Sequence, residues 1–193
     1  MHPLGLDTTR EVPLDVARWL APADRSDHTV LTRCRGPVLD VGCGPGRLVS
    51  ALNQRGVAAL GVDVAETAVA LTRGQGLPAL LRSVFDDLPG EGRWPTVLLL
   101  DGNIGIGGDV LRLLERIRSL LRQGGRLIVE TDADADADEL VLVRFTAGGV
   151  PVGEPIDWAH VGAAALRTYA RRAGYSVAEE WTSAGRPFAA LAR

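Results

Sequence analysis

Residues 37–48, Pro-Val-Leu-Asp-Val-Gly-Cys-Gly-Pro-Gly-Arg-Leu, decide the fold of this chain. The mostly apolar run Val38–Val41 predicts a buried strand, and it leads directly into three glycines at alternate positions. Glycine lets the backbone turn sharply and leaves main-chain N–H groups open to a ligand. A helix expected at about 47–55 would point its positive end at that ligand. The stretch therefore predicts a strand–turn–helix unit that binds a nucleotide-like cofactor.

The spacing of the glycines bears on which cofactor binds. A dinucleotide-binding turn has the pattern G-x-G-x-x-G, but its third glycine would fall at Arg47, and Gly46 comes one residue early. The order Asp40-x-Gly42-x-Gly44-x-Gly46 resembles motif I of the class I S-adenosylmethionine-dependent methyltransferases. The resemblance implies that the turn wraps the aminocarboxypropyl part of the cofactor and that Asp40 helps to hold its ammonium group.

A second carboxylate supports a nucleoside ligand. The expected strand Ala59–Asp63 ends in Asp63, about 20 residues beyond Gly42, which is the distance expected for an acid on ribose hydroxyls. A carboxylate can accept a hydrogen bond from each hydroxyl of a diol. This feature alone does not distinguish between nucleoside cofactors.

Strands and helices alternate along most of the chain. The expected parallel strands are 38–41, 59–63, 79–84, 96–101 and 126–130. The expected helices between them are about 47–55, 66–73 and 110–121. Strands at Tyr175–Thr182 and Pro187–Ala192 resemble the hairpin that ends the methyltransferase sheet. We therefore expect an α/β fold: a doubly wound, mostly parallel seven-stranded sheet with an antiparallel last strand and helices on both faces.

The ends of the chain suggest a main domain with a short addition. The resemblance covers about residues 36–193, which we expect to form the methyltransferase domain that binds S-adenosylmethionine. Residues 1–35 would form an N-terminal helical segment, a candidate lid, with short helices at 14–20 and 27–34. Ser26 or Asp27 would cap the second helix.

Residues 131–156 interrupt the alternation. Four aspartates occupy alternate positions between 132 and 138, superficially like a calcium-binding EF-hand loop. That loop needs glycine at its sixth place and glutamate at its twelfth, where this chain has Ala137 and Val143. We expect a solvated acidic loop over the pocket and no metal site.

A helix from about Trp158 to Ala173, capped by Asp157, is expected to follow. His160 would then lie at a helix N-terminus, which favours the neutral imidazole that a general base requires. The alternative is a surface or half-packed histidine. Trp19 and Trp158 are candidates for the wall of an acceptor pocket or for core packing.

Carboxylates gather where the expected strands end. Asp40, Asp63, Asp101 and Glu130 lie at or beside the ends of four of the five strands. Active sites of open parallel sheets form beyond these ends. Clustered carboxylates repel one another and so cost stability. Their presence at one edge of the sheet therefore favours a functional site over chance.

The resemblance also suggests roles after the third and fourth strands. The family usually has an acid near the adenine amino group, but Val84 occupies that slot, so Asp86 or Phe85 would serve there. The segment Asp101–Asp109 is rich in glycine and differs from the N-P-P-Y motif of enzymes that methylate nucleic-acid amines. Asp101 could accept a hydrogen bond from the cofactor ammonium, and Asn103 could contact the methyl acceptor. The implied cofactor-binding residues are Asp40, Gly42, Cys43, Gly44, Gly46, Asp63, Val64, Phe85, Asp86, Asp101, Gly102 and Asn103.

The predicted activity is methyl transfer from S-adenosylmethionine, with S-adenosylhomocysteine as product, to a small-molecule acceptor. Candidate catalytic residues are Asn103, His160 and Glu130, since a hydroxyl acceptor needs a general base. The alternatives are a non-catalytic protein that binds S-adenosylmethionine and an NAD(P)-dependent oxidoreductase.

Composition narrows the partners. The chain of 193 residues has a formal net charge of −3 and no lysine, which excludes Schiff-base catalysis. No single basic stripe is expected, so nucleic acid is not an expected partner. Cys34 and Cys43 are expected to be reduced thiols of a cytoplasmic protein, and no membrane-spanning run occurs. We expect a monomer or homodimer.

Overall fold

A computed structural model describes residues 9–193. Residues 1–8, the start of the expected N-terminal segment, lie outside the described residues. In chain order the elements are β1 (Arg10–Pro13), α1 (Val16–Leu20), α2 (Arg25–Leu31), β2 (Val38–Val41), α3 (Arg47–Gln54), β3 (Ala59–Asp63), α4 (Glu66–Gly74), β4 (Ala79–Leu81), β5 (Trp94–Leu99), the 3₁₀ turn η1 (Asn103–Gly105), α5 (Val110–Leu120), β6 (Leu121–Glu130), β7 (Asp138–Ala147), β8 (Val150–Val161), α6 (Ala163–Arg172), β9 (Ser176–Ser183) and β10 (Arg186–Ala192).

The main sheet has seven strands in the order β4-β3-β2-β5-β6-β10-β9. The pairs from β4 to β6 are parallel, whereas β10 is antiparallel to both β6 and β9. The central strand β2 lies between β3 and β5, with Asp40 opposite Gly61 on one side and Leu98 on the other. The predicted fold class is therefore confirmed, including the antiparallel last strand.

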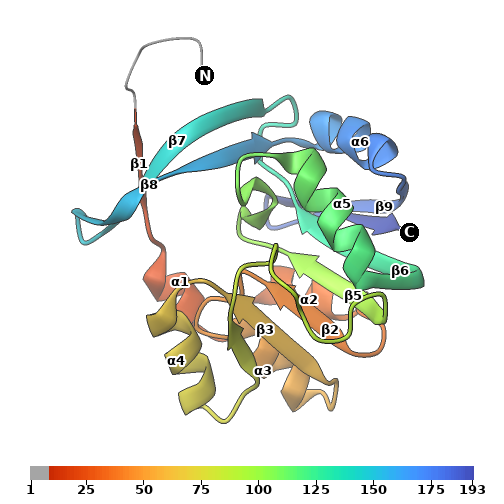
Figure 1. Cartoon of the computed structure of the whole chain (residues 1–193), viewed down its shortest axis with the longest axis horizontal. Coiled ribbons are helices and arrows are strands. Elements are labelled where there is room, and N and C mark those ends of the chain that lie inside the picture. Colours follow the sequence, from red (N-terminus) through yellow and green to blue (C-terminus); the bar gives the residue numbers. More distant parts are fainter. Residues whose placement is uncertain (1–8) are drawn as a thin grey trace.

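Alternate residues of the central strands pack on opposite faces of the sheet, which places helices on both sides (Figure 1). On β5, Val97 and Leu99 belong to the cluster that includes α5 and α6, while Leu98 belongs to the cluster with α2 and α3. Val69 of α4 packs in a third cluster with Val49 of α3. The continuous apolar run of β5 thus reflects a strand that is covered on both faces.

A second, three-stranded sheet corrects the expectation for residues 131–156. The acidic run does lie in a loop, up to the start of β7 at Asp138, but the rest of the segment forms most of the antiparallel pair β7–β8, which was not expected, and β1 pairs in parallel with β7. Figure 1 shows this pair as a long hairpin beside the main sheet. Only the beginning of the segment is a loop, where Asp134 and Asp136 donate their backbone N–H groups to the carboxylates two residues earlier. We call β1, β7 and β8 the accessory sheet.

The predicted helix from Trp158 to Ala173 begins too early. Residues 158–161 belong to β8, and α6 starts at Ala163. Ala159 and Val161 are buried, whereas Trp158 and His160 are only partly buried, and this alternation is the period of a strand. Gly162 follows the strand and is the N-cap of α6, and only glycine fits there because a Cβ would lie 2.2 Å from the carbonyl oxygen of Asp134. His160 is therefore a strand residue and does not lie at a helix N-terminus.

The helix α2 is also capped differently from the prediction. Asp24 is its N-cap, and its side chain accepts from the backbone N–H of Asp27, whose side chain accepts in return from Asp24. This reciprocal capping box satisfies two backbone donors at the start of the helix. None of the helices among residues 9–193 is long and apolar enough to cross a lipid bilayer.

An ion-pair network joins the N-terminal helices to the carboxyl edge of the main sheet. Asp27 of α2 is fully buried and pairs with Arg47 of α3 and, at 3.0 Å, with Arg186 of β10. Arg47 also pairs with Asp101, and Arg186 binds both oxygens of Glu130 at 2.6 and 2.7 Å. Because a buried charge without its partner is costly, the network requires all five side chains together.

We predict that Arg47→Met lowers the free energy of unfolding by about 3 kcal/mol, because it leaves the Asp27 carboxylate buried with only part of its compensation. Urea unfolding followed by circular dichroism measures the change. The control is Arg167→Met, which removes an exposed pair with Glu180 and should change the free energy of unfolding far less. Adding Asp27→Asn to Arg47→Met should recover part of the loss. Equal losses of unfolding free energy in Arg47→Met and Arg167→Met would contradict this account.

Candidate functional site

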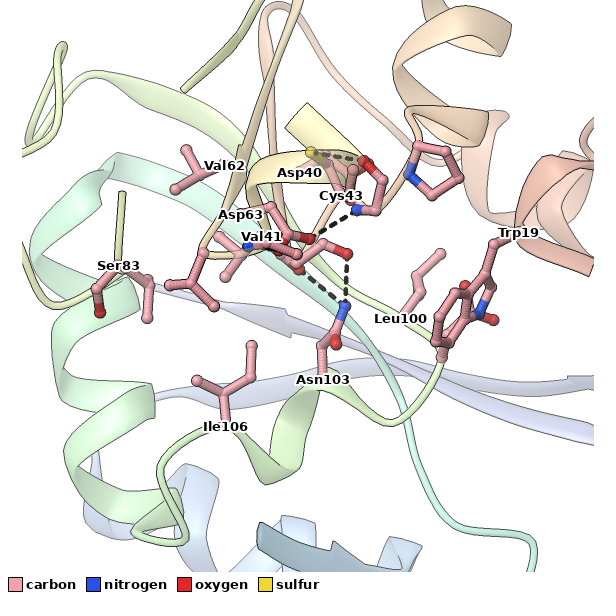
Figure 2. Close-up of a pocket in the computed structure, with 18 of the residues that line it drawn as sticks. Trp19, Asp40, Val41, Cys43, Val62, Asp63, Ser83, Leu100, Asn103 and Ile106 are labelled. Atoms are coloured by element: carbon pink, nitrogen blue, oxygen red, sulfur yellow. Dashed lines mark hydrogen bonds between the residues drawn. The ribbon is translucent and has the colours of Figure 1, made fainter. Parts of the chain in front are cut away.

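A cavity of about 410 Å³ lies beyond the carboxyl ends of β2, β3 and β5. These strands flank the point where the strand order reverses, which is where open α/β sheets bind ligands. Figure 2 shows Asp63, Asn103 and Ile106 around the cavity, with Trp19 and Ser83 on opposite sides of it. The volume is within the range of small-molecule sites.

The glycine turn forms one wall of the cavity and is braced by Asn103. The Asn103 side-chain amide donates to the carbonyl oxygens of Val41 and Gly42, both at 3.0 Å. A Cβ at Gly42 would lie 2.4 Å from the Nδ2 atom of Asn103, so only glycine allows this contact. Gly44, at a φ of 54°, would meet no atom within 4 Å if it carried a Cβ. The turn is thus rigid at Gly42 and open to the cavity at Gly44.

Asp63 lies at the cavity and is fixed by backbone donors. Its Oδ2 atom accepts from the N–H of Gly44 at 2.8 Å, and its Oδ1 atom accepts from the N–H of Ala65 at 2.8 Å. A carboxylate has about four acceptor positions, so each oxygen keeps the capacity for a further hydrogen bond. Asp63 can therefore still accept from a diol.

Asp40 is the buried acid of the site. It is 2% exposed, lines the cavity, and its Oδ2 atom has no hydrogen-bond partner among residues 9–193. Burial raises the pKa of Asp40 to about 7; Arg47 opposes this rise, whereas the nearby carboxylates of Asp101 and Asp63 add to it. A buried polar atom without a partner is costly, so this oxygen suits a cationic donor brought by a ligand.

Asp101 also lines the cavity, but arginines occupy its carboxylate. Arg18 and Arg186 each approach its Oδ1 atom at 3.2 Å, and Arg47 pairs with its Oδ2 atom. Its backbone has a φ of 53°, which is unusual for a residue with a side chain. The N–H of Asp101 donates to Glu130 at 2.8 Å. Of the two acids expected near an ammonium group, only Asp40 has an unpaired oxygen.

Of the other residues expected to bind the cofactor, some line the cavity and others do not. Cys43 and Val64 line the cavity, and burial raises the pKa of the Cys43 thiol. Four of the expected residues are not among those lining it: Gly46, Phe85, Asp86 and Gly102. The Phe85 ring lies under the Arg112 guanidinium at 4.2 Å, and the Asp86 carboxylate accepts from the N–H of Ser83. Ser83 and Val84 line this end of the cavity instead.

The three candidate catalytic residues are not brought together. Asn103 lies at the cavity, where it braces the glycine turn. Glu130 is bound to Arg186 and does not line the cavity. His160 does not line it either; its Nδ1 atom lies 3.1 Å from Asp132, and its Nε2 atom is buried with no partner within the described part of the chain.

The outer part of the cavity contains residues that sequence reasoning mostly missed. We define the outer chamber by six apolar residues that line it: Leu14, Trp19, Phe145, Val152, Ile156 and Trp158. The two tryptophans were candidates for such a wall, and both do line the cavity. The other four come from the segment after β1 and from the accessory sheet, whose strands were not predicted.

Comparisons with known proteins agree with this geometry. Residues 15–180 match a family described as a methyltransferase domain. The chain belongs to the methyltransferase family. No curated protein matches the sequence. The family resemblance found in the glycine turn is therefore confirmed, and the chain is a class I methyltransferase by family and by fold.

Solved structures of methyltransferases share the fold at low sequence identity. A methyltransferase from Bacteroides fragilis, in complex with S-adenosyl-L-homocysteine, is 22% identical with a TM-score of 0.74, over 92% of this chain and 81% of that one. The 1,6-didemethyltoxoflavin-N1-methyltransferase of Burkholderia thailandensis is 19% identical with a TM-score of 0.67, over 93% and 81%. A glycopeptide N-methyltransferase complexed with S-adenosylmethionine is 15% identical with a TM-score of 0.68, over 89% and 94%.

The raised pKa of Asp40 predicts a pH dependence of stability in the ligand-free protein. An aspartate in an unfolded chain titrates near pH 4, whereas Asp40 titrates at about 7 in the fold. Between these values the folded state binds more protons, so the contribution of Asp40 is fully present below about pH 4 and is lost as pH rises through 7.

From pH 5 to pH 8 the wild type should therefore lose about 2–3 kcal/mol of unfolding free energy relative to Asp40→Asn, whose side chain does not titrate. Urea titrations at several pH values measure both proteins, and other titrating groups cancel in the comparison. Parallel pH profiles of the two proteins would contradict the raised pKa.

Proposed function

We propose that this chain transfers a methyl group from S-adenosylmethionine to a small-molecule acceptor. The observation that carries the proposal is that Asp40 lines the cavity beside the glycine turn and that its buried Oδ2 atom has no partner in residues 9–193. An ammonium group placed there would satisfy this oxygen and offset the cost of burying a charge.

The donor set around the cavity suits the remaining parts of this cofactor. Asp63 would accept from the ribose hydroxyls through the acceptor positions that Gly44 and Ala65 leave free. The open space at Gly44 would let the ligand approach the backbone of the turn. At the other end, Ser83 and Val84 would border the adenine ring. Asp101 would contribute through its arginine partners rather than by direct contact with the ammonium.

When bound, S-adenosylmethionine supplies an activated methyl group. The contribution of the protein is then mainly to hold both reactants in a productive orientation. Asn103 serves this purpose by fixing the glycine turn, since its amide spans the end of β2. The proposal assigns no proton transfer to Glu130 or His160, because neither lines the cavity.

The limited volume of the cavity, about 410 Å³, supports a small-molecule acceptor. The outer chamber is formed by the accessory sheet and by the segment around α1, which leave a space of limited volume. The formal net charge of −3 does not favour binding to a nucleic-acid backbone. Two of the neighbouring structures are named as methyltransferases of 1,6-didemethyltoxoflavin and of a glycopeptide, which supports a small acceptor here.

Replacing Gly44 tests the role of the turn in cofactor binding. We expect Gly44→Leu to weaken binding of S-adenosylhomocysteine at least a hundredfold, because the side chain would enter the space that the ligand needs. Isothermal titration calorimetry measures the dissociation constant. Gly56→Leu is the matched control: Gly56 also has a positive φ and open space, but it does not line the cavity. Equal losses in both variants would show a general effect of backbone strain.

Replacing Asp40 tests the ammonium contact separately from the nucleoside. At pH 8, Asp40→Asn should weaken S-adenosylhomocysteine binding about 10- to 100-fold, the value of one charge-assisted hydrogen bond. Binding of 5′-methylthioadenosine, which lacks the amino-acid part, should change less than about threefold. An equal loss for both ligands would mean that Asp40 acts through the fold rather than through the ammonium.

A further inference from the structure

The six side chains that define the outer chamber are apolar, and three of them are aromatic: Trp19, Phe145 and Trp158. Phe145, Val152, Ile156 and Trp158 come from the accessory sheet, while Leu14 and Trp19 come from the segment around α1. The charged residues that line the cavity come from β2, β3, α3, the loop after β4 and the turn after β5, and within residues 9–193 each except Asp40 has a polar partner. A charged acceptor that lies against these six side chains would therefore gain no charged partner from them.

Aromatic rings give the chamber a defined shape. Phe145 and Trp158 meet edge to face, with ring centroids 5.6 Å apart and planes at 88°. The Trp158 indole packs closely against Gly105 of η1: a Cβ at this glycine would lie 2.4 Å from the Nε1 atom of the indole. Ile106 forms an isolated antiparallel bridge with Trp158, which fixes the backbone as well. Rings held in this way favour a flat ligand that stacks on one ring and meets the edge of another.

Part of the chamber is apolar surface that the protein leaves uncovered. Val152 is 48% exposed and Ile156 is 43% exposed, and both line the cavity. Burying apolar surface is favourable, so a ligand that covers these side chains gains affinity there. A hydrated, strongly polar ligand would gain nothing from them.

We propose that the outer chamber selects a planar, uncharged aromatic ring system as the methyl acceptor. This inference rests on the proposed function, because it concerns the acceptor side of the same cavity. Val152 and Phe145 are then specificity-determining residues that contact the ring. The selection is a property of binding and is measurable without turnover.

Three probes of similar size separate the relevant properties. The probe 1-naphthol is planar and uncharged, 1-naphthoate is planar and anionic, and decahydro-1-naphthol is uncharged but not planar. Equilibrium dialysis, with and without S-adenosylhomocysteine, should show that 1-naphthol binds at least tenfold more tightly than the other two. A preference for either of the others, or no preference, would overturn the proposal.

A matched pair of variants locates the binding. Val150 and Val152 lie two residues apart on β8 and are 65% and 48% exposed, but only Val152 lines the cavity. Val152→Asp should weaken 1-naphthol at least tenfold and strengthen binding of 1-naphthylmethylammonium, while Val150→Asp should change both less than twofold. Equal effects of the two variants would overturn the assignment.

Calorimetry with S-adenosylhomocysteine separates this proposal from the proposed function. Wild type, Val150→Asp and Val152→Asp should bind it equally, because both positions lie away from the glycine turn. If the wild type bound 1-naphthol as expected but did not bind S-adenosylhomocysteine, the proposed function would fail and the preference of the chamber would stand. The reverse result would overturn only the proposal on the acceptor.

Discussion

The structure depends on how negative charge is balanced at the carboxyl edge of the main sheet. Parallel strands bring Asp40, Asp63, Asp101 and Glu130 to one edge, where their mutual repulsion would oppose folding. Guanidinium groups compensate Asp101 and Glu130, and backbone N–H groups compensate Asp63. Asp40 alone keeps an oxygen without a partner among residues 9–193. The same balance that allows the sheet to form therefore leaves one buried acid available for a cationic ligand.

The parts of the fold that sequence predicted well are those whose signals are local. The strand Val38–Val41, its glycine turn and Asp63 lie within 26 residues, and each signal concerns neighbours in the chain. The accessory sheet has no such signal, because β1 pairs with a strand that begins more than 120 residues later. The exposed Val150 and Val152 also blur the alternation expected of a half-buried strand. Asp157 has the side chain of a helix N-cap, which predicts a helix from Trp158, but α6 begins only after Gly162.

The sequence predicted which residues lie at the candidate site better than it predicted which partners their side chains contact. Asp40, Asp63 and Asn103 do line one cavity, since the carboxyl ends of parallel strands meet at one edge. The arginine partners of Asp101 could not be predicted, because Arg18 and Arg186 lie at opposite ends of the sequence. The brace formed by Asn103 depends on the absence of a Cβ at Gly42, which becomes visible only in three dimensions.

The pairing of β1 with β7 also has a consequence for how the protein is made. Residues 38–101, which supply most of the cofactor side of the cavity, leave the ribosome as one continuous stretch. The acceptor side must wait, because β1 emerges first and its partner strand is completed only at Ala147. The ion pairs of Asp27 and Asp101 with Arg186 at the cofactor side must wait longer still, since Arg186 belongs to the last strand of the chain.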